Sequence, residues 1–305
     1  MMTRWKKLIA ILLVLALSLS LTACSGFGSG IAKAAVKMQK LKNFRTDLDM
    51  DLGMSLSMFG EVLDMDLDLT GTVDWNTSPF KGKADIRVSM EDTAEQLLLY
   101  METEESKLVV YSSADGGKTW SRSEAAASSV PSLNLGKESL AALIQLGKSF
   151  KETGTEIVRG SEAVVYSGTV HLAEFITDDT LDSILKAIEE AIEKALDTDI
   201  DLSEADLNDL GDVPLTFSID KKSSMLVKVS TDLTEMVQKL TPVILEQVMK
   251  TVVDQSGLGA LAGLGGLDLG MLGIDFDIRQ LVITMELYDF DAVGVITIPP
   301  EVHSA

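Results

Sequence analysis

Carboxylates at alternating positions are the side chains of this chain that could most readily bind a ligand. Two stretches carry aspartate at every second position, and the four residues that could act together are Asp49, Asp51, Asp66 and Asp68. Alternation places side chains of one parity on one face of a strand, and Ca²⁺ binds clustered carboxylate oxygens. These four residues therefore form a candidate Ca²⁺ site. The alternative is a solvated acidic face that discourages edge-to-edge aggregation.

A second acidic run, at Asp197, Asp199 and Asp201, begins like an EF-hand loop. Its sixth position is Leu202, where the loop needs glycine, and its twelfth is Asn208, where it needs glutamate. The pattern fails at these two positions, so we do not expect Ca²⁺ there.

Nucleophilic catalysis has few candidate residues. The histidines are His171 and His303, the first expected where a strand ends and the second at a frayed end of the chain. A catalytic triad would have to use one of them as its base, and no Gly-x-Ser-x-Gly elbow is present. A zinc site needs three or four His, Cys or carboxylate ligands in close array, and the sequence singles out none. We predict no catalytic residues and no enzyme.

The single cysteine, Cys24, follows a leader of the secretory type. Three basic residues precede an apolar run over residues 8–21, and small residues connect that run to Cys24. The run is short for a transmembrane helix, which needs about 20 apolar residues. An ordinary secretory signal with an incidental cysteine is one interpretation.

The residues Leu21-Thr22-Ala23-Cys24 resemble the lipobox of bacterial lipoproteins. The resemblance implies that residues 1–23 are a signal peptide and that Cys24 carries a covalent diacylglycerol. It also implies a lipid anchor on the extracytoplasmic face of the cell membrane.

The charge of the mature chain excludes several partners. Removal of residues 1–23 takes away three of the 26 basic residues and none of the 47 acidic ones, which leaves a net charge of −24. Nucleic acid, itself anionic, would repel such a chain. Attachment to a membrane must come from acyl chains, because no basic excess exists to bind anionic lipid. No protein partner can be named from the sequence.

A long hairpin is the clearest structural prediction. Apolar residues occupy even positions over residues 47–58 and odd positions over residues 63–75. A two-residue turn at Phe59-Gly60 pairs residues whose numbers sum to 119, which places all apolar side chains on one face. In that register Asp51 faces Asp68, and like charges directly opposed destabilise a sheet.

The rest of the chain predicts a single α+β domain over residues 31–305, after a Gly/Ser-rich tether at residues 24–30. Helices are predicted at 31–41, 137–150, 180–196 and 233–253. Further strands are predicted at 80–90, 96–102, 107–112, 119–121, 155–159, 163–170, 214–220, 225–231, 279–288 and 293–298.

Methionine is frequent on the predicted apolar faces. Met is flexible and polarizable, so it fills irregular core gaps or lines a cavity that accepts varied acyl chains. The candidate residues for binding an apolar ligand are Met50, Met54, Met65, Leu67 and Met90.

This layout resembles the uncharacterised lipoproteins of Gram-positive bacteria whose fold is similar to the LolA-type carriers and the mycobacterial LppX/LprG-type half barrels. The resemblance rests on the lipobox, a short helix, a run of strands bearing Tyr100, Tyr111 and Gly117-Lys118-Thr119-Trp120, and a helix–strand alternation that ends near Ile298-Pro299. It implies a large curved antiparallel sheet, a half barrel, with helices packed against its concave face.

Two functions follow as hypotheses. The resemblance implies a non-enzymatic lipoprotein that binds or carries a lipid or another apolar ligand. The alternative is a scaffold or interaction lipoprotein with a filled core and an acidic face that could bind Ca²⁺.

Overall fold

A large antiparallel sheet dominates the computed structural model, which describes residues 29–58, 61–90, 93–105, 107–126, 150–171, 189, 211–242, 244 and 274–303. The strands are β1 (Asn43–Met58), β2 (Glu61–Thr77), β3 (Phe80–Met90), β4 (Thr93–Glu104), β5 (Lys107–Ser113), β6 (Ser121–Ala126), β7 (Lys151–Val158), β8 (Ser161–His171), β9 (Asp212–Asp220), β10 (Leu226–Asp232) and β11 (Ile274–Tyr288). Helix α2 (Ser29–Met38) precedes them, and residues 234–242 are also helical.

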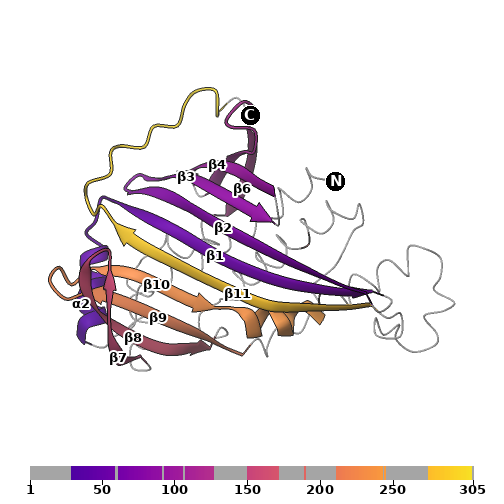
Figure 1. Ribbon diagram of the computed structural model, residues 1–305. Coiled ribbons are helices and arrows are strands. Elements are labelled where there is room, and N and C mark those ends of the chain that lie inside the picture. Colours follow the sequence, from indigo (N-terminus) through magenta and orange to yellow (C-terminus); the bar gives the residue numbers. More distant parts are fainter. Residues whose placement is uncertain are drawn as a thin grey trace.

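All eleven strands form one open sheet in the order β6-β5-β4-β3-β2-β1-β11-β10-β9-β8-β7 (Figure 1). Neighbouring strands are antiparallel, and β11 joins the β1–β6 half to the β7–β10 half. The two edge strands, β6 and β7, are not paired with each other. The predicted α+β class with a large antiparallel sheet is confirmed.

The predicted hairpin is confirmed residue by residue. In the β1–β2 register Leu56 lies opposite Leu63, Met54 opposite Met65, and Asp51 opposite Asp68. Every pair sums to 119, as the alternation of apolar residues requires, because a slip of one residue would place leucine opposite aspartate throughout. The turn residues 59 and 60 lie outside the described residues.

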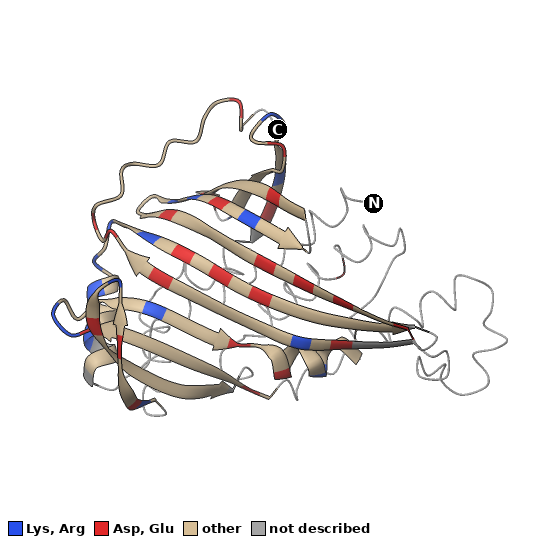
Figure 2. Cartoon of the chain, in the orientation of Figure 1, with Lys and Arg blue, Asp and Glu red and all other residues tan. Residues whose placement is uncertain are grey.

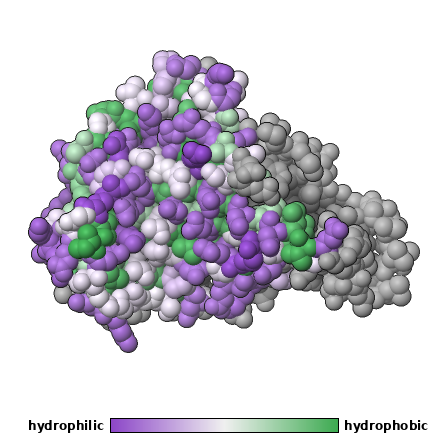
Figure 3. All heavy atoms as spheres, viewed as in Figure 1, coloured by the Kyte–Doolittle hydropathy of each residue, from purple (hydrophilic) through white to green (hydrophobic). Residues whose placement is uncertain are grey.

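The two faces of the sheet differ in polarity. The inner face carries the even-numbered residues of β1 and the odd-numbered residues of β2, and its side chains form a single apolar cluster, the core. Residues from distant strands, such as Leu108 of β5 and Val213 of β9, belong to this one cluster, so the sheet curls around it and the inner face is concave. The outer face, toward the viewer in Figure 3, is mostly hydrophilic.

Two helical segments pack against the inner face. Helix α2 contacts β9 and β10 and contributes Ile31 and Ala34 to the core. The segment 234–242 adds the partly buried Met236 and Val237. The predicted helix at 31–41 thus begins at Ser29 and ends at Met38, and 234–242 lies within the predicted helix at 233–253. Residues 137–149 and nearly all of 180–196 lie outside the described residues.

The predicted strand at 293–298 is wrong, and the strand predicted at 119–121 coincides with β6 only at Ser121. Residues 293–298 have no strand pairing and run as an irregular segment back toward the β4–β6 end of the sheet (Figure 1). Side chains rather than a neighbouring strand bind its backbone. Val293 N donates to Asn43 Oδ1 and Ile296 N donates to Asn76 Oδ1, both at 2.8 Å. Alternating apolar residues indicated a strand here because this segment also buries every second residue, Ile296 and Ile298.

Candidate functional site

The five residues predicted to bind an apolar ligand lie on the inner face of β1, β2 and β3. The strand registers place Met54 opposite Met65, and Leu67 opposite both Leu52 and Met90. Met50 and Leu67 are buried in the core, whereas Met54, Met65 and Met90 are only partly buried. The structure thus brings the five together on one apolar surface, and ligand binding there stays a prediction.

Burial along this surface falls toward the β1–β2 turn. Leu69 and Val73, in the middle of β2, are 0% exposed, while Leu63 near its start is 53% exposed. Leu56, the partner of Leu63, is partly buried. The apolar face therefore continues beyond the fully buried part of the core. Near the β1–β2 turn it consists of leucine and methionine side chains that are only partly covered by packing.

The four aspartates of the candidate Ca²⁺ site lie on the outer face of β1 and β2, where acidic residues recur along the strands (Figure 2). Asp66 is bound by Arg279 of β11, whose Nη2 donates to Asp66 Oδ1 at 2.5 Å. Asp51 lies opposite Asp68. The pKa of Asp51 is raised mainly by partial desolvation, and to a smaller extent by repulsion from Asp49 and Asp68.

These aspartates do not meet at a point suited to one ion. Within the described residues, three other side chains place potential metal-ligand atoms within 4.8 Å of one another. They are Glu102, Glu104 and His303. Ca²⁺ binding by the aspartates stays a prediction, and it would have to compete with Arg279 for Asp66.

A small apolar cluster interrupts the polar outer face at β4 and β5. Its buried members are Val109, Tyr111, Ile298 and Val302, with Tyr100 and Trp120 partly buried beside them; we call it the outer cluster. The aromatic residues of the middle of the sequence thus form a platform on which the C-terminal segment packs. Lys83, Tyr100, Trp120 and Glu301 help to line a cleft of about 210 Å³ beside it.

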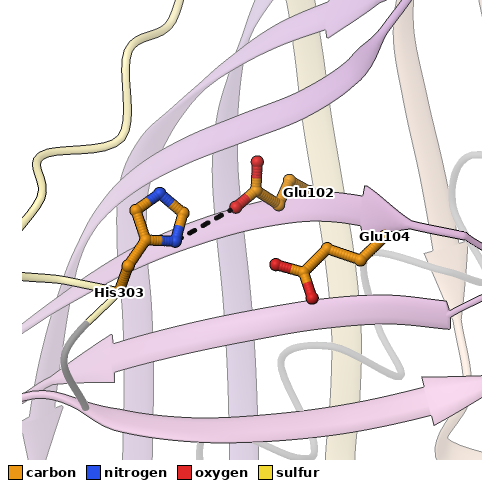
Figure 4. Close-up of side chains that lie close together, drawn as sticks. All are labelled: Glu102, Glu104 and His303. Carbon is orange, nitrogen blue, oxygen red and sulfur yellow. Dashed lines mark ion pairs between the residues drawn. The ribbon is translucent and has the colours of Figure 1, made fainter.

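Packing of the C-terminal segment brings His303 to two glutamates of β4 (Figure 4). His303 Nδ1 lies 3.5 Å from Glu102 Oε1 and 3.1 Å from Tyr111 Oη. No pattern in the sequence marks this group, because His303 is about 200 residues from Glu102 and lies in a segment expected to be frayed. Its one local signal is the i, i+2 spacing of Glu102 and Glu104, which puts both on one face of a strand.

The remaining predicted residues lie at or beyond the limits of the described structure. Cys24 and the predicted signal peptide and tether lie outside the described residues, apart from Ser29 and Gly30 at the start of α2. His171 is the last residue of β8. In the part of the chain that the structure describes, no helix is both long and apolar enough to span a membrane.

Comparisons with known proteins give structural neighbours only. No family model and no curated protein matches the chain. The lipoprotein LppX of Mycobacterium tuberculosis is 11% identical, with a TM-score of 0.40 over 88% of this chain and 97% of its own. LprF from Mycobacterium bovis is 13% identical, with a TM-score of 0.39 over 90% of this chain and 99% of its own.

A beta-barrel-like protein from Brucella abortus is more distant, at 10% identity and a TM-score of 0.24 over 81% of this chain and 96% of its own. The fold of this chain rests on its own strand order and registers.

Proposed function

We propose that this protein is a lipid-anchored extracytoplasmic lipoprotein that binds a lipid or another apolar ligand against the inner face of its sheet, without catalysing a reaction. The observation that supports the proposal most is the partly covered end of the apolar face, where Met54 and Met65 are only partly buried and Leu63 is exposed. Apolar surface left accessible on a concave face is where an acyl chain gains most by burial, at about 0.8 kcal/mol for each CH₂ group.

Methionine suits that role chemically. Its unbranched side chain adopts several conformations at low cost and can adjust to acyl chains of different length or unsaturation. Met54 and Met65 face each other across the β1–β2 ladder, so a ligand chain lying along the strands would contact both.

Uptake of a fluorescent fatty acid by the detergent-purified full chain tests the proposal, together with native mass spectrometry for co-purified lipid. Met54→Gln combined with Met65→Gln should weaken uptake about tenfold or more, because two amides would be desolvated in the ligand site. Ser55→Gln combined with Ser57→Gln is the matched control, since these neighbours lie on the outer face of the same strand. A wild-type protein that binds no acyl ligand would refute the proposal.

The anchor needs a separate test. Mass spectrometry of the native protein should find diacylglycerol on Cys24 as the first residue, and Cys24→Ser should release the protein from the membrane fraction. A free Cys24 thiol or an uncut leader would refute the anchor while leaving the apolar ligand testable.

The scaffold alternative keeps one observation in its favour. Asp51 lies opposite Asp68 and next to Asp49 on its own strand face. Desolvation is the main cause that raises the pKa of Asp51, and a bound cation would relieve the repulsion from Asp49 and Asp68 that adds to it. Calorimetry with Ca²⁺ separates the two functions: saturable heat that Asp51→Asn abolishes, in a protein that takes up no lipid, would favour the scaffold.

A further inference from the structure

The C-terminal segment fixes a histidine over two carboxylates on the outer face. Val302, which precedes His303, is 0% exposed, and it packs with Val109 and Tyr111 of β5 in the outer cluster. His303 is therefore held in place by a neighbour buried against the sheet. Its ring also contacts the Tyr111 ring edge-on, with centroids 5.3 Å apart.

The potential ligand atoms lie at spacings that suit a tetrahedral metal ion. His303 Nδ1 is 3.5 Å from Glu102 Oε1 and 3.1 Å from Tyr111 Oη, and Tyr111 Oη is 3.4 Å from Glu104 Oε1. Neighbouring ligand atoms around a tetrahedral Zn²⁺ with bonds of about 2.0–2.1 Å are about 3.3 Å apart. The ligand atoms of Glu102, Glu104 and His303 lie within 4.8 Å of one another, so they would move closer together to hold such an ion.

One oxygen of the cluster lacks the partner that its burial requires. Glu102 is 9% exposed, and its Oε1 is buried with no hydrogen-bond partner among the described residues. This oxygen points at His303 (Figure 4). Lys81 pairs with the other oxygen, Oε2, at 3.2 Å. A buried carboxylate oxygen without a donor is costly, and a bound cation would satisfy it.

The neighbouring basic residues bind the Oε2 atoms of the two glutamates and not their Oε1 atoms. Arg122 binds Glu104 through Oε2 at 3.0 Å, just as Lys81 binds Glu102 through Oε2. Each glutamate is thus oriented by a basic residue on Oε2, while Oε1 of Glu102 lies toward His303 and Oε1 of Glu104 lies beside Tyr111 Oη. Groups that orient the ligands in this way are typical of metal sites and support metal affinity.

We propose that Glu102, Glu104 and His303 form a Zn²⁺-type site on the outer face, with Tyr111 Oη beside it. One imidazole and two carboxylates suit Zn²⁺ better than Ca²⁺ or Mg²⁺, which prefer oxygen ligands alone. The ion joins β4 to the C-terminal segment. The site is separate from the inner apolar face, so the proposal does not depend on lipid binding.

Metal titration of the full chain, purified in detergent and stripped with a chelator, tests the site. Calorimetry should find one saturable Zn²⁺ per chain, and Co²⁺ should give the visible absorption of a four-coordinate ion. His303→Ala and Glu102→Gln should each weaken Zn²⁺ binding by about tenfold or more. His171→Ala is the matched control, since it removes the other histidine of the chain and should leave binding unchanged.

A second measurement separates a bound metal from a purely structural contact. Zn²⁺ should slow amide hydrogen exchange over residues 296–303 in the wild type and leave it unchanged in His303→Ala. The proposal is overturned if wild type shows no saturable Zn²⁺ binding, if His303→Ala and Glu102→Gln bind as tightly as wild type, or if His171→Ala weakens binding equally.

Discussion

The inner and outer faces of the sheet come from the same strands but are stabilised by different contacts. On the inner face, leucine, isoleucine, valine and methionine from β1–β5 and β8–β11 pack into one continuous core. On the outer face, ion pairs such as Arg45–Asp74 and Lys81–Glu102 connect neighbouring strands, and four buried residues form the small outer cluster. Apolar packing on the inner face therefore connects the whole sheet, whereas each ion pair on the outer face connects only two strands.

This difference has a functional meaning. A ligand that enters the inner face must be apolar and must fit beside a core that all parts of the sheet share. The outer face, in contrast, can gain or lose a local contact, such as a metal ion, without disturbing that core. Four predictions test the comparison, in order of decreasing effect.

Truncating the middle of the inner face should destabilise the protein most. Leu69→Ala removes a side chain that is 0% exposed and should lower the free energy of unfolding by about 2–5 kcal/mol. Leu63→Ala, at the 53% exposed end of the same strand face, should cost less than about 1 kcal/mol. If urea unfolding shows the same loss of free energy of unfolding for Leu69→Ala and Leu63→Ala, the apolar face is packed evenly to its end.

Asp220 links the outer face to acid stability. Burial favours a raised pKa, but hydrogen bonds from the Ser161 hydroxyl and the Ser223 and Lys222 backbone outweigh it and lower the pKa of Asp220 to about 2. A folded pKa below the unfolded value of about 3.9 stabilises the protein above that pH, and the stabilisation is lost as the pH falls to about 2.

Asp220→Ala should therefore cost about 2 kcal/mol at pH 6. The difference in free energy of unfolding between wild type and Asp220→Ala, measured with urea, should become smaller as the pH falls from 4 to 2. Ser161→Ala removes one of the donors. Its difference from wild type in free energy of unfolding should be smaller than that of Asp220→Ala and should shrink over the same pH range. A difference that is constant with pH would contradict the assigned role of Asp220.

The outer cluster should respond locally. Val302→Ala removes two buried methyl groups and should cost about 1–2 kcal/mol. The effect should be confined to faster hydrogen exchange over residues 296–303 and the facing part of β5, because Val302 packs in the outer cluster and not in the core. If exchange in β1 and β2 rises as much, the outer cluster is part of the global core and the comparison fails.

The exposed ion pair of Arg279 should contribute least. Asp66 is largely exposed, so Arg279→Gln should cost less than about 1 kcal/mol, and the cost should shrink as salt is added. If the aspartates of β1 and β2 bind Ca²⁺, the same substitution should strengthen that binding severalfold, because it frees Asp66. Calorimetry that detects no Ca²⁺ binding in either protein would leave these residues as a solvated face.

The β1–β2 hairpin shows how much the sequence could predict. Its register follows from alternation alone, since only one pairing puts all the leucines and methionines on one side. The predicted strand at 293–298 failed because burial of alternate residues also occurs in an irregular segment that lies on a sheet.

The amino-acid pattern alone is enough to predict strands with one apolar and one polar face, the antiparallel class, and the placement of Met54 and Met65 on the apolar side. These properties depend on local periodicity, which neighbouring residues carry. Only the tertiary structure decided that the sheet stays open, that Arg279 reaches Asp66, and that His303 meets Glu102. Such contacts join residues about 200 positions apart, and no local pattern encodes which strand or segment will lie beside another.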